Sequence, residues 1–259
     1  MAETDLADRL KAERIALALR LGDNSLILAQ RLSAWCGHAP ELELDLALSN
    51  VALDLLGEAR MLLTYAGELE GAGRDEDRLA YFRDTSEFRN ILLVEQPNED
   101  FAVTIVRQFL FDAWHLELAT ALSGSADPRL AEIAAKTVKE ARYHRKFSTD
   151  WMIRLGDGTQ ESHDRIQAAL DDLWIYTGEL FASDATDRAL AAAGIAPDPA
   201  TLEAPWHDFM DAALAEATLV KPQGAYMQGG GRDGHHSEHL DYVLAEMQVL
   251  ARAHPDARW

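Results

Sequence analysis

The chain has 259 residues, which is enough for one large domain or two small ones. Its formal net charge of −20 argues against nucleic-acid or anionic-membrane binding, because Lys and Arg hold such polyanions. Cys36 is the only cysteine, which excludes an intrachain disulfide and a thiolate metal cluster. The sequence shows no signal-peptide core and no apolar run of about 18 residues, so we expect a cytoplasmic protein that does not span a membrane.

Hydrophobic residues recur every three or four positions along most of the chain, which predicts helices. The first helix is expected over residues 13–35, with a possible irregularity at 22–24. Residues 223–235 are glycine-rich and are expected to form a structureless loop. The other expected helices, in chain order, cover residues 41–69, 78–88, 101–122, 128–155 and 160–181, a short stretch within 182–203, and residues 206–219 and 236–253.

Two helix starts carry clear capping signals. Asp127 is followed by Pro128, which combines an acidic N-cap with a proline at the first helical position. Asn98 or Asp100 is expected to cap the helix that begins at Phe101. No comparable alternation typical of strands occurs, so the sequence predicts an all-α, up-and-down helical bundle with additional C-terminal helices.

The second long helix carries a carboxylate in its apolar stripe. Glu58 falls near the middle of this stripe, where an ionised carboxylate needs a cation, a metal or a proton. The stripe, which steps by alternate fours and threes, consists of Leu44, Leu48, Val51, Leu55, Glu58, Leu62, Tyr65 and Leu69. The helix over residues 128–155 similarly carries His144 within its stripe.

Inward carboxylates and histidines in a bundle suggest a di-iron carboxylate site, which needs two Glu-x-x-His motifs. No such motif occurs in this chain. The two windows where it would be expected read Leu-Leu-Gly-Glu over residues 55–58 and Ala-Arg-Tyr-His over residues 141–144. Each window keeps one polar group, Glu58 or His144, and has an apolar residue, Leu55 or Ala141, where the Glu would be.

Two interpretations of these polar residues remain open. Glu58, Asp112 and His144 are the candidate ligands of a mononuclear metal site. Alternatively, they form hydrogen-bonded polar groups in the core, since a carboxylate facing a histidine satisfies both groups without a metal. Only one of the three candidate ligands is a histidine, which is a poor match to oxygen-activating metal sites and favours the second interpretation.

Three histidines form a second cluster close to the last expected helix. His236 and His239 are three residues apart, and His235 precedes them. A metal site here would lack an obvious third ligand, so solvent-exposed or interface histidines are the favoured interpretation. The nearby glycine run at 229–231 lacks the preceding strand and the following Lys-Ser/Thr of a phosphate-binding loop.

At several long motifs the sequence resembles the C-subunit family of bacterial phenylacetyl-CoA epoxidases. The likeness covers essentially the whole chain and ends at Trp259. The motifs that carry it are LGDN, WCGHAPELELDLALSN, LLVEQPNEDFA, DAWH, KEARYH, RLGDGT and SEHLDYVLAEMQ. The resemblance implies a single ferritin-like helical domain over residues 1–259, with a core bundle at about 12–181 and a C-terminal helical extension at about 182–259.

The resemblance implies a non-catalytic subunit of a multicomponent monooxygenase in aerobic phenylacetate degradation. This chain would hold no cofactor and would support a catalytic A subunit that carries di-iron. The two would form heterodimers that pair into heterotetramers, joined by a small B subunit and a reductase. The reductase would deliver electrons from NADPH through flavin and iron–sulfur groups, and the complex would epoxidise the ring of phenylacetyl-CoA.

The resemblance also places contacts with the CoA ester on two segments of this chain. These segments comprise Asp84, Thr85, Ser86 and Glu87, and Ala185, Thr186 and Asp187. Plain surface loops are the alternative interpretation of both segments. Neither segment is basic, so the CoA phosphates are expected to find their cations elsewhere, for example on a partner subunit.

Two rival functions stay open at this stage. The chain is either an interaction subunit of the epoxidase or a metal-dependent oxidoreductase that uses its own degenerate ferritin-like site. A lone helical regulator is a third option, which soluble expression of a stable monomer without a partner would favour.

Overall fold

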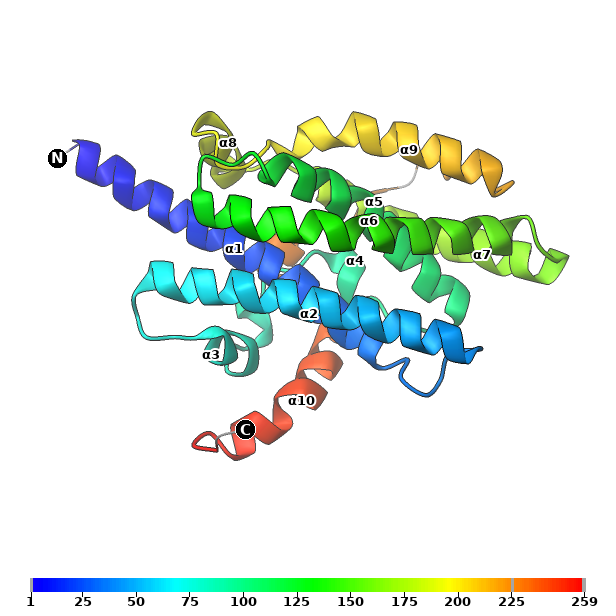
Figure 1. Cartoon of the computed structure of the whole chain (residues 1–259), viewed down its shortest axis with the longest axis horizontal. Coiled ribbons are helices and arrows are strands. Elements are labelled where there is room, and N and C mark those ends of the chain that lie inside the picture. The colour runs from blue at the N-terminus through cyan, green and yellow to red at the C-terminus, as the bar shows by residue number, and fades with distance from the viewer. Residues whose placement is uncertain (1, 225, 258–259) are drawn as a thin grey trace. The chain divides into compact units, whose positions relative to one another are not determined.

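A computed structural model describes the backbone of residues 2–224 and 226–257 and the side chains of residues 10–224 and 226–257. Every regular element in these ranges is a helix, which confirms the predicted all-α class (Figure 1). The motif position Trp259 lies outside the described residues. None of the described helices is both long and apolar enough to cross a membrane.

The α-helices fall into long pairs and short connectors. Short 3₁₀ turns, labelled η1 to η4, occupy Thr85–Glu87, Trp174–Leu180, Pro199–Leu202 and Gly231–Asp233. The α-helices are α1 (Ala2–Ser33), α2 (Leu42–Glu70), α3 (Glu76–Tyr81), α4 (Leu92–Glu95), α5 (Phe101–Leu122), α6 (Pro128–Gly156), α7 (Gln160–Leu173), α8 (Ala185–Ala192), α9 (Glu203–Glu216) and α10 (Glu238–Ala253).

The chain divides into two compact units. The first unit comprises Met1–Gln96 together with Gly230–Trp259, and the second comprises Pro97–Gly229. The second unit is thus inserted between two stretches of the first. This division does not follow the expected boundary near residue 181, and the single ferritin-like domain stays a prediction.

The first unit is built on the pair α1 and α2, which pack along each other (Figure 1). Helix α3 packs against α2, and α10 contacts α1, α3 and α4. The predicted stripe of α2 lies in the core: every member from Leu44 to Tyr65 is buried, while Leu69 is half-buried. Helix α2 ends at Gly71, which adopts a left-handed conformation with φ of 69°.

The second unit is built on the pair α5 and α6. Helix α7 packs on both of them, and α9 contacts both as well. The two predicted start signals are confirmed. The Asp100 side chain accepts a hydrogen bond from the backbone N–H of Val103, and Asp127 accepts bonds from the N–H groups of Arg129 and Leu130.

Several predicted boundaries are wrong in their details. Helix α1 is continuous through residues 22–24 and begins earlier than expected, at Ala2. The helix expected over 78–88 is α3 followed by the separate turn η1. The last turns of the helix expected over 160–181 are the 3₁₀ element η2. The loop expected over 223–235 contains the short turn η4, and α10 starts after His236.

Candidate functional site

Glu58 is buried in the first unit, as the sequence predicts. Its side chain faces α1, where the Ser25 hydroxyl donates a hydrogen bond to Glu58 Oε2 at 3.0 Å. Leu55, one turn before it, is also buried. The carboxylate on α2 is therefore held by a donor from the neighbouring long helix.

Asp112 and His144 lie together in the core of the second unit. Asp112 is fully buried on α5, and its two oxygens accept hydrogen bonds from Gln108 Nε2 at 2.6 Å and from Ser148 Oγ at 2.8 Å. Burial raises the pKa of Asp112, although the nearby His144 and the two hydrogen bonds act in the opposite direction. This carboxyl group therefore favours its neutral form more than an exposed aspartate does.

The candidate metal ligands thus belong to different units. Glu58 lies in the first unit, while Asp112, Ala141 and His144 lie in the second. Within either unit, the described residues contain no group of three or more His, Cys, Asp or Glu side chains arranged to hold a metal ion. The carboxylates of Glu58 and Asp112 instead accept hydrogen bonds from hydroxyl or amide donors of their own unit.

The first unit contains a buried ionic centre that the sequence does not reveal. Asp23 of α1 is fully buried and forms an ion pair with Arg83, through both guanidinium nitrogens Nη1 and Nη2. The backbone N–H of Arg89 also donates to Asp23 Oδ2 at 2.8 Å. Two-pronged pairing of this kind is among the strongest that a carboxylate makes.

Glu95 and His236 form the second half of this centre. His236 Nδ1 donates to Glu95 Oε2 at 2.8 Å, and its Nε2 donates to the Phe88 carbonyl at 3.1 Å. The side chains of His236 and Glu95 are 1% and 0% exposed. Glu95 also accepts bonds from Asn90 Nδ2 at 2.9 Å and from the backbone N–H of Ser237 at 2.7 Å. Three hydrogen-bonding groups therefore converge on this buried carboxylate.

The hydrogen-bond partners of His236 fix its charge. Both ring nitrogens face acceptors, so both carry protons and the ring is an imidazolium. Burial by itself lowers the pKa of His236, but the hydrogen bonds to Glu95 and to the Phe88 carbonyl outweigh it and the pKa is raised. The favoured sequence interpretation, exposed or interface histidines, is therefore wrong for His236, while His235 is exposed as expected.

Glycines allow the chain to reach this centre. A side chain at Gly231 would clash with the carbonyl of Asn90, and one at Gly234 would clash with the carbonyl of Ser86. Gly234 also has a φ of 84°, which favours glycine. The glycine-rich segment therefore lies tightly against residues 86–90, which explains a composition that by itself suggests a structureless loop.

The first predicted CoA segment is a fixed turn that α10 holds in place. Asp84 caps η1, and Arg252 of α10 forms an ion pair with Asp84 at 3.0 Å. The Thr85 hydroxyl donates to Asp241 of α10. Arg89 Nη1 donates to the Ser86 carbonyl at 2.7 Å. Two guanidinium groups of this chain therefore lie beside a segment that has no basic residue of its own.

The second predicted CoA segment is the first turn of α8 in the second unit. Asp184 and Asp187 form a reciprocal capping box, and Asp187 is buried. Ala185 and Thr186 are the first two residues of the helix. The segment is therefore an ordered helix start rather than a loop. Ligand binding at either segment stays a prediction.

The sequence signal for the ionic centre is present but incomplete. Asp23, Asn24 and Ser25 are three consecutive polar residues of α1, and all three are buried. Asp23 accepts a hydrogen bond from the segment that follows η1, and Asn24 accepts one from the start of α4. Ser25 donates a hydrogen bond to α2. The hydrogen-bond partners of these residues are between 33 and 67 residues away in the chain, so local sequence does not reveal them. Without the partners, the polar run suggests only a helix irregularity.

Comparison with known proteins places this architecture in a family. The sequence profile of the family described as "Phenylacetic acid catabolic protein" matches residues 1–259. The chain is 56% identical over 244 residues to an Escherichia coli (strain K12) protein, the C subunit of 1,2-phenylacetyl-CoA epoxidase. That alignment covers 94% of this chain and 98% of the E. coli protein.

Proposed function

Because the chain belongs to the phenylacetic acid catabolic protein family, we propose that it is a non-catalytic subunit of a multicomponent monooxygenase that epoxidises the ring of phenylacetyl-CoA. The similarity to an epoxidase C subunit over nearly the full length of both chains carries this proposal. At that identity and coverage, the helices and their partners are expected to be shared.

The buried acidic residues support the non-catalytic part of the proposal. An oxygen-activating di-metal site needs carboxylates whose oxygens are available to metal ions. Both oxygens of Asp112 instead accept hydrogen bonds from Gln108 and Ser148, and Glu58 accepts one from Ser25. These are the bonds of a polar group that stabilises a core.

The chemistry would then be supplied by partners. A catalytic A subunit would carry the di-iron centre and pair with this chain in a heterodimer, and two heterodimers would form a heterotetramer. A small B subunit and a reductase would complete the assembly, and the reductase would pass electrons from NADPH through flavin and iron–sulfur groups. This chain would contribute a rigid helical surface that positions the catalytic subunit.

A contribution to CoA-ester binding is the finer part of the proposal. Phosphate groups of CoA match guanidinium donors, which bind planar anions through paired hydrogen bonds. Arg89 and Arg252 lie beside Asp84–Glu87 and are the cations of this chain that would approach such a phosphate. The start of α8 at Ala185–Asp187 is the second candidate contact.

Metal analysis and turnover test the proposal directly. The purified chain is expected to contain no stoichiometric iron or manganese and to turn over no phenylacetyl-CoA. Mixing it with the A subunit, reductase and NADPH is expected to raise turnover above that of the A subunit without this chain. About one transition metal per chain, lost in His144→Ala, would instead establish the metal-dependent oxidoreductase. The variant Thr149→Ala, five residues along the same helix, is the matched control.

A further inference from the structure

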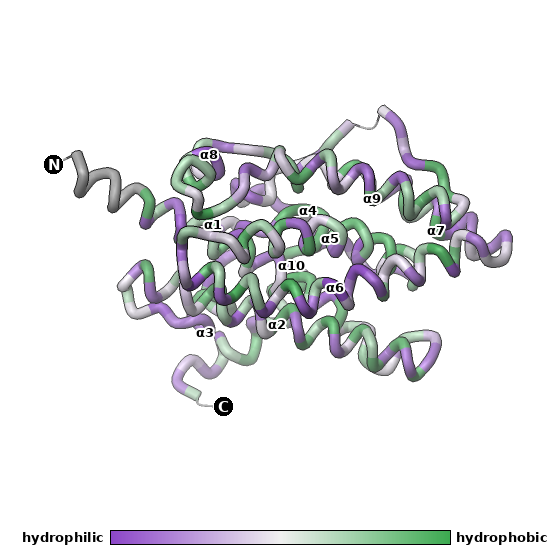
Figure 2. Tube along the Cα trace, turned by 45° about the horizontal axis from the view of Figure 1, so that its top comes forward, coloured by the Kyte–Doolittle hydropathy of each residue, from purple (hydrophilic) through white to green (hydrophobic). Residues whose placement is uncertain are grey.

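Helix α2 carries a second apolar stripe on its solvent-exposed face. The stripe steps by fours and threes, as the buried stripe does, and Figure 2 shows hydrophobic residues recurring along α2. Its leucines are exposed by 71%, 57%, 65% and 39%, in chain order. This outer seam consists of Leu42, Leu46, Ser49, Leu53, Leu56 and Arg60.

The spacing of the outer seam is the spacing of helix–helix packing. Side chains that alternate at four and three residues lie along one line of a helix and interdigitate with a second helix. The seam runs from Leu42 to Arg60, which is about 27 Å of helix. Four exposed leucines in register on a single helix are a contiguous apolar surface rather than scattered surface residues.

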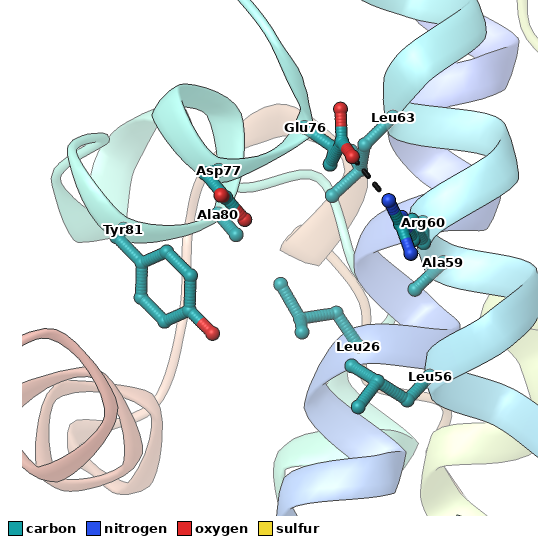
Figure 3. A pocket seen from close by; sticks show the side chains of 9 residues that line it. All are labelled: Leu26, Leu56, Ala59, Arg60, Leu63, Glu76, Asp77, Ala80 and Tyr81. Carbon is teal, nitrogen blue, oxygen red and sulfur yellow. Dashed lines mark hydrogen bonds and ion pairs between the residues drawn. The ribbon is translucent and has the colours of Figure 1, made fainter. Parts of the chain in front are cut away.

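The outer seam ends at a hollow between α2 and α3. The hollow has a volume of about 330 Å³. Leu56 and Arg60, which belong to the outer seam, also line this hollow (Figure 3). Its floor is aliphatic and its rim is polar. The residues that line it are Leu26, Leu56, Ala59, Arg60, Leu63, Glu76, Asp77, Ala80 and Tyr81.

One carboxylate at the rim lacks a direct ion-pair or hydrogen-bond partner among the described residues. Arg60 Nε donates to Glu76 Oε1 at 3.1 Å, so Glu76 is neutralised within the chain (Figure 3). No described residue forms an ion pair or hydrogen bond with the side chain of Asp77. Burial, followed by the neighbouring carboxylates Glu76 and Asp75, raises the pKa of Asp77, and the smaller opposing effect of Arg60 does not offset them. A cation placed at this rim would relieve that repulsion.

Charge distinguishes between possible occupants of this surface. Glu43 and Glu68 are exposed near the two ends of α2, and the whole chain carries a net charge of −20. A second copy would bring the same negative charge to the seam, which opposes association. A helix with an apolar stripe and flanking Lys or Arg side chains is complementary in both shape and charge.

We propose that the outer seam and the adjoining hollow bind one amphipathic helix of the catalytic subunit, whose apolar side chains interlock with the four leucines and whose Lys or Arg reaches Asp77. The identity of the partner rests on the proposed function, while the chemistry of the helix follows from the surface. An aliphatic stem over Leu56 and Ala80 with a cationic head at Asp77 fits a hollow with an apolar floor and an acidic rim.

The test compares two double variants of the full-length chain. Leu46→Glu/Leu53→Glu adds two charges to the outer seam. Tyr242→Glu/Val249→Glu adds the same two charges to α10, at side chains that are 65% and 63% exposed, against 57% and 65% for the leucines. Binding of each to the purified catalytic subunit is measured by calorimetry, and folding is checked by circular dichroism. Glu is a good helix former, so both variants are expected to fold.

The expected result is a loss of affinity of about 30-fold or more for the seam variant and less than about 3-fold for the α10 variant. Equal, near-native affinity of both variants would overturn the proposal while leaving the proposed function intact. Equal loss of affinity in both variants would also overturn the proposal, since the effect would then be one of net charge.

Failure of the unaltered chain to bind the catalytic subunit would instead contradict the proposed function. Self-association of the unaltered chain that the seam variant abolishes would identify a second copy as the occupant and overturn the choice of partner.

A second comparison isolates the cation at the hollow. Asp77→Asn removes the rim carboxylate, and Asp172→Asn removes an exposed carboxylate of the second unit as a charge-matched control. Asp77→Asn is expected to weaken binding about 5-fold to 10-fold at low salt and to lessen its salt dependence. Identical affinities and salt dependences for the two variants would overturn the assignment of a cation at Asp77.

Discussion

The two units each bury a carboxylate completely, but they place it in opposite electrostatic surroundings. Glu95 in the first unit meets the imidazolium of His236 and three donors in all. Asp112 in the second unit meets a neutral amide and a hydroxyl, and its pKa is raised by burial. Equal burial therefore goes with a charged partner in one unit and with neutral hydrogen-bond donors and a raised carboxyl pKa in the other.

Removing the carboxylate of Glu95 is expected to have the largest effect. Glu95→Ala leaves a charged His236 buried without its carboxylate partner and removes the acceptor of the backbone N–H of Ser237. The expected loss is about 3–5 kcal/mol in the free energy of unfolding, as for other broken buried ion pairs. Urea unfolding followed by circular dichroism measures it. A loss below about 1 kcal/mol would contradict a stabilising buried pair between Glu95 and His236.

The free energy of unfolding is expected to depend on pH through His236 of the first unit. The folded pKa of His236 is raised above an unfolded value of about 6.5, so its stabilising contribution is complete below that pH and is lost as pH rises through the folded pKa. The unfolding free energies of the unaltered chain and of His236→Gln are therefore expected to converge as the pH rises above about 6.5, by about 1.4 kcal/mol for each unit of the pKa shift. A difference that is constant from about pH 6 to about pH 9 would contradict the charged imidazolium.

Replacing Asp112 with its neutral isostere is expected to have the smallest effect. Asp112→Asn keeps the shape of a side chain whose pKa is raised by burial, and the Ser148 hydroxyl can reorient to accept a bond. We expect a change within about 1 kcal/mol near neutral pH. A raised carboxyl pKa makes the free energy of unfolding fall as the pH rises from about 4 through the folded pKa. The Asn variant has no carboxyl group at this position, so its free energy of unfolding is expected not to show this fall. Destabilisation as large as that of Glu95→Ala would remove the distinction between the units.

Local signals in the sequence are sufficient for most helices. Alternating fours and threes locate α2 and the burial of Glu58, and the Asp-Pro pair at residues 127 and 128 locates the start of α6. These features depend on neighbours within one or two helical turns. The same periodicity also locates His144, which is buried beside Asp112.

The ionic centre is out of reach of such signals because its partners are distant in sequence. Arg83 is 60 residues from Asp23, and His236 is 141 residues from Glu95. A polar residue gives the same local pattern whether it ends in solvent or in an ion pair, so the sequence alone favours an exposed His236. The glycines at 231 and 234 are the available clue, since close approach of two backbones requires residues without side chains.

The insertion of the second unit has a consequence for synthesis of the chain. Glu95 emerges from the ribosome 141 residues before His236, which is about 7 to 28 s at ordinary translation rates. During that interval Glu95 lacks two of its partners, His236 and Ser237, while Pro97–Gly229 can fold as a contiguous segment. The pairing of Glu95 with His236 can therefore form only after the segment that follows the second unit has been made.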